Sequence, residues 1–501
     1  MRSGPEVRTA AGVVRGRWEK GIAVFRGIPY ARPPVGVRRF RAPVATSAWA
    51  GVRNAYEFGP AVPQAGHTGS VMTSVTGTVD DGSDDCLSLS VWTPDPGDAR
   101  LPVMVWIHGG AYLEGDSANP HCDGAILAAG GVVVVSVNYR TGFDGFAHLA
   151  GEPDNRGLLD QAAALRWVQE NIGGFGGDAG TVTVFGQSAG AGCVAALASM
   201  PLAAGLFRRA IVQSIPCTFF TPQLASAIST RITAEVGVRA TVADLTDIPA
   251  QALVDATETV IAKLPRFADD WGPMTSTPTP FSPVIDGDRL PRSPWRALAD
   301  GAARDIDLLV GHTRDEYRLF AGHLAEHVTD DDVSETVARL APAIDAGRYR
   351  AAYPEATPVQ LCEIVHADWL FRMPSVHLAD AHHAGGSSTW MYELCWAFDR
   401  EQDASHSLDV LLVFSTLAPD EIRSRVTAYP NAADEVIDVA RHMRADWVNF
   451  ATTGTPGWTA YDSHTRPTRV YTAEPTTLSY PEERSRRLWE AVEFDSLDLV
   501  R

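Results

Sequence analysis

Hydrophobic positions in the first half of the chain follow two alternating patterns. Residues 101–107 and 131–137 are short apolar runs with many β-branched side chains, which is typical of strands buried on both faces of a sheet. Residues 158–172 repeat apolar side chains at the spacing of one helical face, at Leu158, Ala162, Leu165, Val168 and Ile172. A strand, a helix and a further strand in this order predict a right-handed crossover and a parallel sheet.

Two later segments interrupt this alternation. Residues from about 221 to 280 and from about 325 to 385 have mainly helical patterns. We interpret them as insertions that form a helical cap over the carboxyl edge of the sheet, where open α/β sheets bind their ligands. The 501 residues contain no internal repeat and no low-complexity linker, so we expect one α/β domain spanning 1–501.

A five-residue motif, Gly-Gln-Ser-Ala-Gly, lies between a predicted strand at 181–185 and a predicted helix at 189–200. Ser188 would then occupy a sharp turn, with Gly186 and Gly190 required because a Cβ at either position would collide across the turn. A chain with 43 glycines can produce this motif by chance. The strand before it and the helix after it favour a nucleophile elbow instead.

A serine nucleophile needs a base, an acid that orients the base, and donors for the developing oxyanion. Gly109 and Gly110 follow the predicted strand 101–107 and could offer backbone N–H groups together with that of Ala189. A Gly-Gly pair alone would be a plain hinge, but with an elbow downstream we interpret it as an oxyanion hole. The acid and the base should follow the serine, although 14 histidines leave the base open among several candidates, including His366, His377, His382 and His383.

Charge and cysteine content exclude several other functions. A formal net charge of −19 opposes binding to nucleic acid or to an anionic membrane. The six cysteines form no CxxC pair, which indicates reduced thiols and no metal site. With no apolar region typical of a secretion signal near residue 1, these features predict a cytoplasmic protein. The oligomeric state stays open, a monomer included.

Longer motifs along the chain resemble the type-B carboxylesterase/lipase family of α/β hydrolases, which includes cholinesterases and bacterial p-nitrobenzyl-type esterases. They lie at residues 25–34, 85–91, 106–111, 138–140, 157–161, 171–178, 185–190 and 447–454. The resemblance covers nearly the whole chain. It implies a large, mostly parallel sheet flanked by helices. It also implies a serine hydrolase that cleaves small-molecule carboxylic esters and needs no metal or organic cofactor.

The resemblance also implies the remaining site residues. The family's acid motif corresponds to 311–317 and places the triad carboxylate on Glu316, and the family's histidine motif begins at His406. The implied triad is Ser188, Glu316 and His406. Asp315 and Asp409 are nearby alternatives that we expect to hold loops, and Ser214 matches a serine that supports the family's acid.

Further implied features concern stability. The resemblance predicts buried ion pairs of Arg140 with Asp160 and of Arg39 with Asp84. The family usually joins the cysteine equivalent to Cys86 to an earlier one, but Val62 stands at that position here. We therefore expect no disulfide, in agreement with a reducing compartment.

Departures from the family bear on the substrate. Tyr317 and Ile215 replace glycines beside the proposed acid and beside Ser214, and Gln187 replaces a common glutamate next to the nucleophile. Residues 62–85 lack the aromatic side chain that would hold a quaternary ammonium, which argues against choline esters. Several apolar residues could line a pocket or belong to the core: Phe219, Phe220, Phe320, Trp369, Leu370 and Phe371.

Because no basic cluster is evident, we expect a preference for uncharged, fairly hydrophobic esters. An amidase, carbamate hydrolase or lactonase with the same triad stays open as an alternative. So does a non-catalytic, neuroligin-like binding protein, although all three triad positions are filled.

Overall fold

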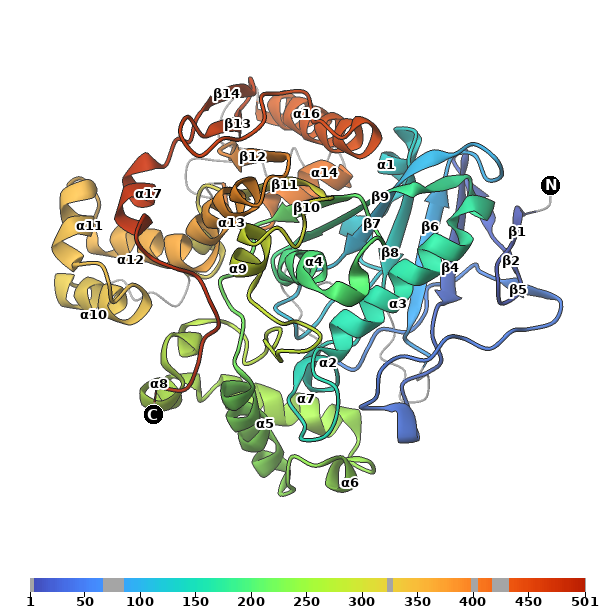
Figure 1. The fold of residues 1–501 in the computed structure, drawn as a ribbon, viewed down its shortest axis with the longest axis horizontal. Helices are drawn as coiled ribbons and strands as arrows, with labels where there is room; N and C mark the ends of the chain where they lie inside the picture. The colour runs from blue at the N-terminus through green and yellow to red at the C-terminus, as the bar shows by residue number, and fades with distance from the viewer. Residues whose placement is uncertain (1–3, 66–84, 322–327, 398–403, 417–431, 501) are drawn as a thin grey trace.

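A computed structural model describes residues 4–65, 85–321, 328–397, 404–416 and 432–500 (Figure 1). Its largest element is an eleven-stranded sheet in the order β14-β13-β12-β11-β10-β9-β7-β8-β6-β4-β3. The strands are β3 (Arg17–Glu19), β4 (Ile22–Pro29), β6 (Ser88–Thr93), β7 (Leu101–Ile107), β8 (Val133–Val137), β9 (Gly177–Gln187), β10 (Arg209–Gln213), β11 (Asp307–Thr313), β12 (Thr389–Leu394), β13 (Pro467–Tyr471) and β14 (Thr476–Ser479). A small second sheet contains β1 (Glu6–Arg8), β2 (Val13–Arg15) and β5 (Val52–Asn54).

The sheet is parallel from β8 to β13 and antiparallel at both edges. This confirms the predicted parallel sheet. The predicted strand at 101–107 matches β7, and the run at 131–137 becomes β8 two residues later, because Gly131 has a φ of +93° that ends the preceding turn. The predicted helix at 158–172 becomes α3 (Arg156–Asn171).

Alternate residues of the central strands face two different cores. In β7, Val103 and Val105 pack in the core beneath α3 and α4 (Ala189–Ser199), whereas Met104 and Trp106 pack in the core beneath α14 (Leu408–Phe414) and α16 (Ala432–Thr453). All four side chains are buried. Because strand side chains alternate with a period of two, one continuous apolar run supplies both cores.

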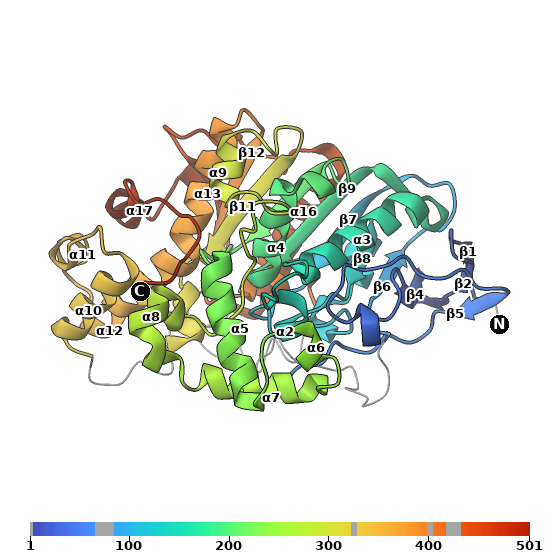
Figure 2. The same cartoon turned by 60° about the horizontal axis from the view of Figure 1, so that its bottom comes forward.

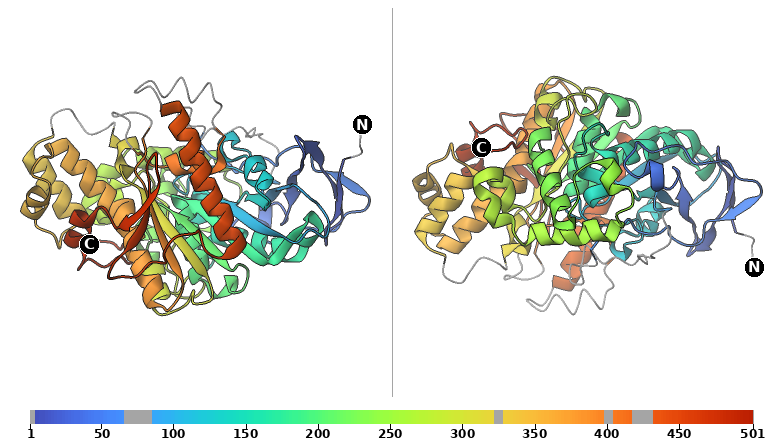
Figure 3. Two further views of the ribbon diagram at one scale, coloured as in Figure 1. Left: turned by 90° about the horizontal axis from the view of Figure 1, so that it is seen from above. Right: turned by 90° about the horizontal axis from the view of Figure 1, so that it is seen from below.

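Helices cover both faces of the sheet. Helices α3, α4, α9 (Pro294–Ala299) and α13 (Met373–Ala384) form one layer, and α1 (Ala125–Ala129), α14 and α16 form the other. The view from above in Figure 3 shows the long helix α16 running obliquely across its face of the sheet. The short helix α2 (Gly142–Phe146) packs against α3.

The segment 221–280 forms a separate group of helices, which lies at the bottom of Figure 1 and comes forward in Figure 2. It contains α5 (Pro222–Val236), α6 (Val242–Leu245), α7 (Ala250–Ile261) and α8 (Ala268–Trp271). In the segment 325–385, α10 (Asp330–Leu340), α11 (Ala346–Ala352) and α12 (Pro358–Ala367) form another group at one end of the molecule. Residues 325–327 lie outside the described ranges.

The last helix of that second segment differs from our expectation. Helix α13 packs on β11 and α9, in the layer that covers the sheet. It directly precedes β12, which pairs in parallel with β11, so the chain must return across this face before the next strand begins. The short helix α17 (Glu483–Trp489), near the C-terminus, packs against α11 and α13.

One of the two predicted buried ion pairs can be compared with the structure. Arg140 and Asp160 form a buried pair with 2.7 Å between Nη2 and Oδ1, as expected. The second pair was predicted between Arg39 and Asp84, and Asp84 lies outside the described residues. Among the described residues, Arg39 pairs with Asp144 on α2, with 2.8 Å between Nε and Oδ2.

Two expected absences can be compared with the described residues. All six cysteines are free, and Cys86 is buried. Val62 is also buried, at the position of the missing partner. Across the described ranges, no helix combines the length and the apolar character that crossing a membrane requires.

Candidate active site

Ser188 lies at the turn between β9 and α4, with φ of 57° and ψ of −126°. Residues other than glycine rarely adopt these angles, and such strain clusters at functional sites. A Cβ on Gly190 would lie 2.2 Å from the carbonyl oxygen of Ile107, and a Cβ on Gly186 would lie 2.7 Å from the backbone of Gly190. Both glycines are therefore required by the close approach of β9, α4 and the end of β7.

The loop after β7 lies directly against this elbow. A Cβ on Gly109 would lie 2.8 Å from the carbonyl oxygen of Gln187, so only glycine permits the approach. Gly110 has a φ of +111°. Within the described part of the chain, no acceptor pairs with the backbone N–H of Gly109, Gly110 or Ala189, and all three residues line one cavity. These donors are available to an oxyanion.

Glu316 and His406 lie in contact, although 90 residues separate them in the chain. Nδ1 of His406 is hydrogen-bonded to Oε2 of Glu316. Burial acts to raise the pKa of the Glu316 carboxyl, but His406 and the hydrogen bonds outweigh it and leave that pKa below its ordinary value. An ionised Glu316 accepts the Nδ1 proton of His406, which leaves Nε2 as the basic nitrogen.

Ser214 and the start of the acid loop fix the other oxygen of Glu316. The Ser214 hydroxyl donates to Oε1 over 2.5 Å, and the backbone N–H of Thr313 donates to the same atom over 2.8 Å. Ser214 follows β10 with a φ of +58°, and its N–H donates to the carbonyl of Gly311 in β11. The ends of two neighbouring parallel strands thus orient the carboxylate.

The alternative carboxylates bond elsewhere. Asp315 pairs with Arg314 and accepts from the backbone N–H of Ala404, two residues before His406. Asp409 accepts from Gln213 over 2.9 Å and from the hydroxyl of Tyr392 over 2.7 Å. The remaining candidate histidines, on α12 and α13, do not line the cavity: His366, His377, His382 and His383.

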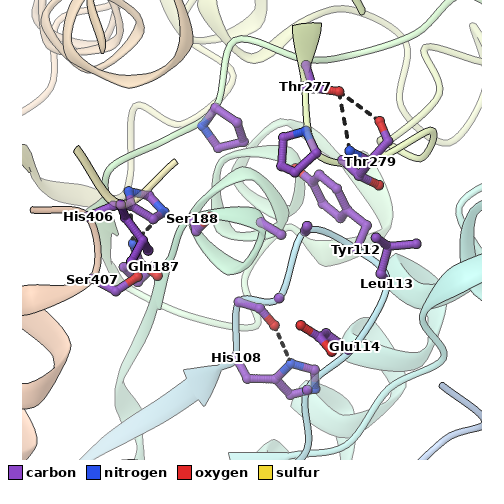
Figure 4. A pocket seen from close by; sticks show the side chains of 18 of the residues that line it. His108, Tyr112, Leu113, Glu114, Gln187, Ser188, Thr277, Thr279, His406 and Ser407 are labelled. Carbon is purple, nitrogen blue, oxygen red and sulfur yellow. Dashed lines mark hydrogen bonds between the residues drawn. The ribbon is translucent and has the colours of Figure 1, made fainter. Parts of the chain in front are cut away.

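His406 has neighbours on more than its Glu316 side. The amide nitrogen of Gln187 lies 3.0 Å from Nε2, and the ring of Phe371 stacks on the imidazole with 4.2 Å between centroids. No hydrogen bond joins Ser188 to His406 among the described contacts, although both side chains face the same cavity (Figure 4). The contact with Gln187 was not predicted, because the motif showed only that a charge had been lost.

The cavity has a volume of about 570 Å³ and is lined mainly by apolar groups. Of the apolar residues singled out in the sequence, Phe320, Leu370 and Phe371 line it, whereas Phe219, Phe220 and Trp369 are buried in the core. Tyr317 and Ile215 are buried outside the lining, so their bulk does not narrow the cavity. Four further lining residues were not predicted from the sequence: Tyr112, Leu113, Ile261 and Leu319.

Charged groups at the cavity are all acidic. No Lys or Arg belongs to its described lining, and the carboxylates there are Glu114, Asp116 and Glu258. Elsewhere in the described ranges, no group of three or more His, Cys, Asp and Glu side chains could hold a metal ion. The arrangement can support nucleophilic catalysis by a serine with a histidine base.

Comparison with known proteins relates the whole chain to one family. The carboxylesterase family model matches residues 3–487. The para-nitrobenzyl esterase of Bacillus subtilis is 37% identical over 497 residues, which cover 96% of this chain and 97% of that protein. The phenmedipham hydrolase of Pseudarthrobacter oxydans is 33% identical over 471 residues, which cover 91% of each protein.

Solved structures agree with the sequence comparison. The carboxylesterase EST55 of Geobacillus stearothermophilus, solved at pH 6.2, is similar with a TM-score of 0.84 and 34% identity, and the match covers 97% of this chain and 99% of that one. The sheet and its flanking helices are therefore those of an α/β hydrolase. The chain belongs to the carboxylesterase family, and it is a serine carboxylic-ester hydrolase.

Proposed function

We propose that Ser188, His406 and Glu316 form the catalytic triad of an esterase that acts on uncharged, fairly hydrophobic esters. The observation that carries the proposal is the buried Glu316–His406 pair, which opens on the same cavity as Ser188 and the unpaired N–H groups of the oxyanion loop. Neither half of this arrangement is useful for hydrolysis without the other.

In this mechanism His406 takes the proton of Ser188 at Nε2 while the serine oxygen attacks the ester carbonyl. Glu316 fixes the tautomer and stabilises the imidazolium that forms. The N–H groups of Gly109, Gly110 and Ala189 bind the oxyanion, each lowering the barrier by about 3 kcal/mol. His406 then gives the proton to the leaving alcohol, and water activated by the same imidazole releases the acid from Ser188.

The proposed substrate preference rests on the lining of the cavity. Its walls are mainly apolar, and its described lining offers carboxylates but no cation to an anionic substrate. A carboxylate or phosphate on the substrate would therefore be repelled. We propose that esters with apolar acyl groups and uncharged alcohols fit this site best.

The cap forms part of this proposal. We propose a single catalytic domain spanning 1–501, in which the two helical insertions complete the cavity. Thr277 and Thr279 reach it from the first segment (Figure 4), as do Glu258 and Ile261. Leu370 and Phe371 reach it from the second segment.

We also propose a reducing, cytoplasmic location, supported by the six free cysteines. Four of them are buried thiols whose pKa is raised by burial: Cys86, Cys122, Cys193 and Cys217. Cell fractionation with an antibody to the chain tests this location.

The experiment is a p-nitrophenyl ester series of increasing acyl length, measured for the wild type and for Ser188→Ala. We expect turnover by the wild type and none by the variant, with Ser199→Ala as the control. Ser199 is a buried serine at the end of α4, the helix that follows Ser188. Its hydroxyl donates to the carbonyl oxygen of Ala195 within the helix, and it does not line the cavity. Turnover retained by Ser188→Ala would refute the triad, and faster cleavage of a matched anilide would identify an amidase.

A further inference from the structure

A single π-helical turn, η9 (Asp368–Arg372), forms one wall of the cavity. Such turns are rare and frequently occur at functional sites. Here the turn joins α12 to α13 and directs Leu370 and Phe371 to the cavity. The Phe371 ring stacks on the imidazole of His406 at an interplanar angle of 28°. The position of this turn therefore affects the packing of the proposed base.

The first and last residues of the turn form a buried ion pair. Nε of Arg372 lies 3.1 Å from Oδ1 of Asp368, and neither side chain is more than 5% exposed. The other oxygen of Asp368 accepts from the hydroxyls of Ser485, over 2.5 Å, and Tyr349, over 3.1 Å. Burial raises the pKa of Asp368 to about 6, against the opposing effect of Arg372.

Arg372 also connects three segments that are distant in sequence. Nη1 donates to the carbonyl oxygen of Arg314 over 3.3 Å, and Nη2 donates to Glu482 over 3.2 Å and to Ser485 over 3.1 Å. Arg314 stands two residues before Glu316 in the acid loop. One guanidinium thus contacts the acid loop, the turn that packs on His406, and the C-terminal region that begins α17.

A buried ion pair is weak evidence for a contribution to stability, because apolar residues of similar volume often replace one without loss. The contacts of Arg372 have a different feature in common. Two of the three segments that it joins carry Glu316 or the ring stacked on His406. Only a planar group with several fixed donors can hold all three at once, and a lysine ammonium cannot reproduce that fork.

We propose that Arg372 is a positioning residue for the esterase reaction. It holds the acid loop and Phe371 in fixed relative positions, so that the Glu316–His406 pair stays aligned with Ser188. The proposal rests on the triad proposed above. Arg372 acts through these neighbours and does not line the cavity itself.

The primary test is Arg372→Lys, assayed for kcat and KM on p-nitrophenyl butyrate and for the rate of organophosphate labelling of Ser188. We expect kcat and the labelling rate to fall by about tenfold to a hundredfold, because small misplacements in a catalytic site have effects of this size. KM should change less than about threefold, since the cavity walls that bind the acyl group are kept. Loss through instability alone would instead lower the amount of active enzyme, as titrated by Ser188 labelling, with kcat per active site unchanged.

Arg156→Lys is the matched control. Arg156 is also fully buried, and its guanidinium donates to the backbone carbonyls of Asp144, Pro153, Phe143 and Ala147, away from the proposed triad. We expect Arg156→Lys to lower the melting temperature and to leave kcat per active site unchanged. Wild-type kcat in Arg372→Lys, or equal losses in both variants, would overturn the proposal.

A second variant decides the question if Arg372→Lys does not fold. Asp368→Leu combined with Arg372→Met removes both fully buried charges. Of the described residues, only Glu482 loses its cation, and its side chain is 22% exposed to water, so this variant should fold. A reduced kcat in the double variant supports the proposal, and a wild-type kcat overturns it. Ser188→Ala, measured in parallel, distinguishes failure of the proposed triad from failure of the positioning role. Turnover by Ser188→Ala refutes the triad. An inactive Ser188→Ala together with a fully active Arg372 variant refutes only the positioning role.

Discussion

The side-chain amide nitrogen of Gln187 lies 3.0 Å from Nε2 of His406, the ring nitrogen that the proposed mechanism assigns to the proton of Ser188. The same amide nitrogen is 3.5 Å from Nδ1, so it approaches both ring nitrogens together and lies over the ring more than along its edge. In the free enzyme, the residue beside the nucleophile thus contacts one face of the imidazole, and this amide does not occupy the in-plane lone pair of Nε2.

Replacing Gln187 by methionine should slow the reaction modestly. Gln187→Met keeps the length of the side chain but removes the polar contact that holds one face of the imidazole, and a neutral hydrogen bond is worth about 1 kcal/mol, or about fivefold in rate. We expect kcat/KM on p-nitrophenyl butyrate to fall by up to about fivefold. A rise in kcat/KM would indicate that the amide competes with Ser188 for Nε2 instead.

Replacing the proposed acid should have a far larger effect. In Glu316→Gln, the neutral amide can donate a hydrogen bond to Nδ1 of His406, which favours the tautomer with its proton on Nε2. The amide also cannot stabilise an imidazolium, so kcat should fall by about 10⁴-fold. Steady-state kinetics measure this loss. Asp409→Asn is the control, because Asp409 is equally buried beside His406 but bonds to Gln213 and Tyr392. Equal losses in the two variants would reassign the acid.

The elbow itself predicts a structural effect. In Gly190→Ala, the new methyl group would lie 2.2 Å from the carbonyl oxygen of Ile107, a backbone atom at the end of the buried strand β7. Either β7 or α4 must move, so we expect a loss of stability of about 1 to 3 kcal/mol together with most of the activity. Gly173→Ala is the control, because nothing lies within 4 Å of a Cβ at that position. Thermal unfolding and ester hydrolysis measure both effects.

A buried carboxyl outside the active site should make the stability of the folded protein depend on pH. Glu393 on β12 is fully buried, neither of its oxygens has a hydrogen-bond partner in the described ranges, and burial raises its pKa to about 8. Its pKa in the unfolded chain is about 4.3, so the folded state binds the extra proton between these values. The contribution of protonated Glu393 to the free energy of unfolding is therefore fully present below about pH 4, and it is lost as the pH rises to about 8.

Glu393→Gln imitates the protonated carboxyl at every pH. We therefore expect the variant to gain stability over the wild type as the pH rises from 5 to 9, by up to about 4 kcal/mol, because the pKa of Glu393 in the folded protein is raised to about 8. Urea denaturation at several pH values measures this difference. Parallel stability curves for the two proteins would contradict a protonated Glu393 in the folded state.

Local sequence patterns were enough to predict the parts of the fold that depend on near neighbours. The apolar run at 101–107 became β7, and the spacing at 158–172 became α3, because the side-chain periods of two and 3.6 hold wherever those backbones form. The elbow at Ser188 was equally readable, since the steric limits on a tight turn fall on the two glycines within the motif. Assigning the acid and the histidine needed the family resemblance as well, because no local rule selects one histidine among fourteen.

Only the tertiary structure decided which distant groups meet. In the structure, Arg39 pairs with Asp144 on α2, α13 packs on β11 and not in the expected cap, and the amide of Gln187 lies over the ring of His406. Each of these contacts joins segments far apart in the chain, and close packing of whole elements fixes such contacts without leaving a periodic trace in either segment. The same reason explains why Arg372, an ordinary cation in the sequence, became the link between the acid loop and the wall of the cavity.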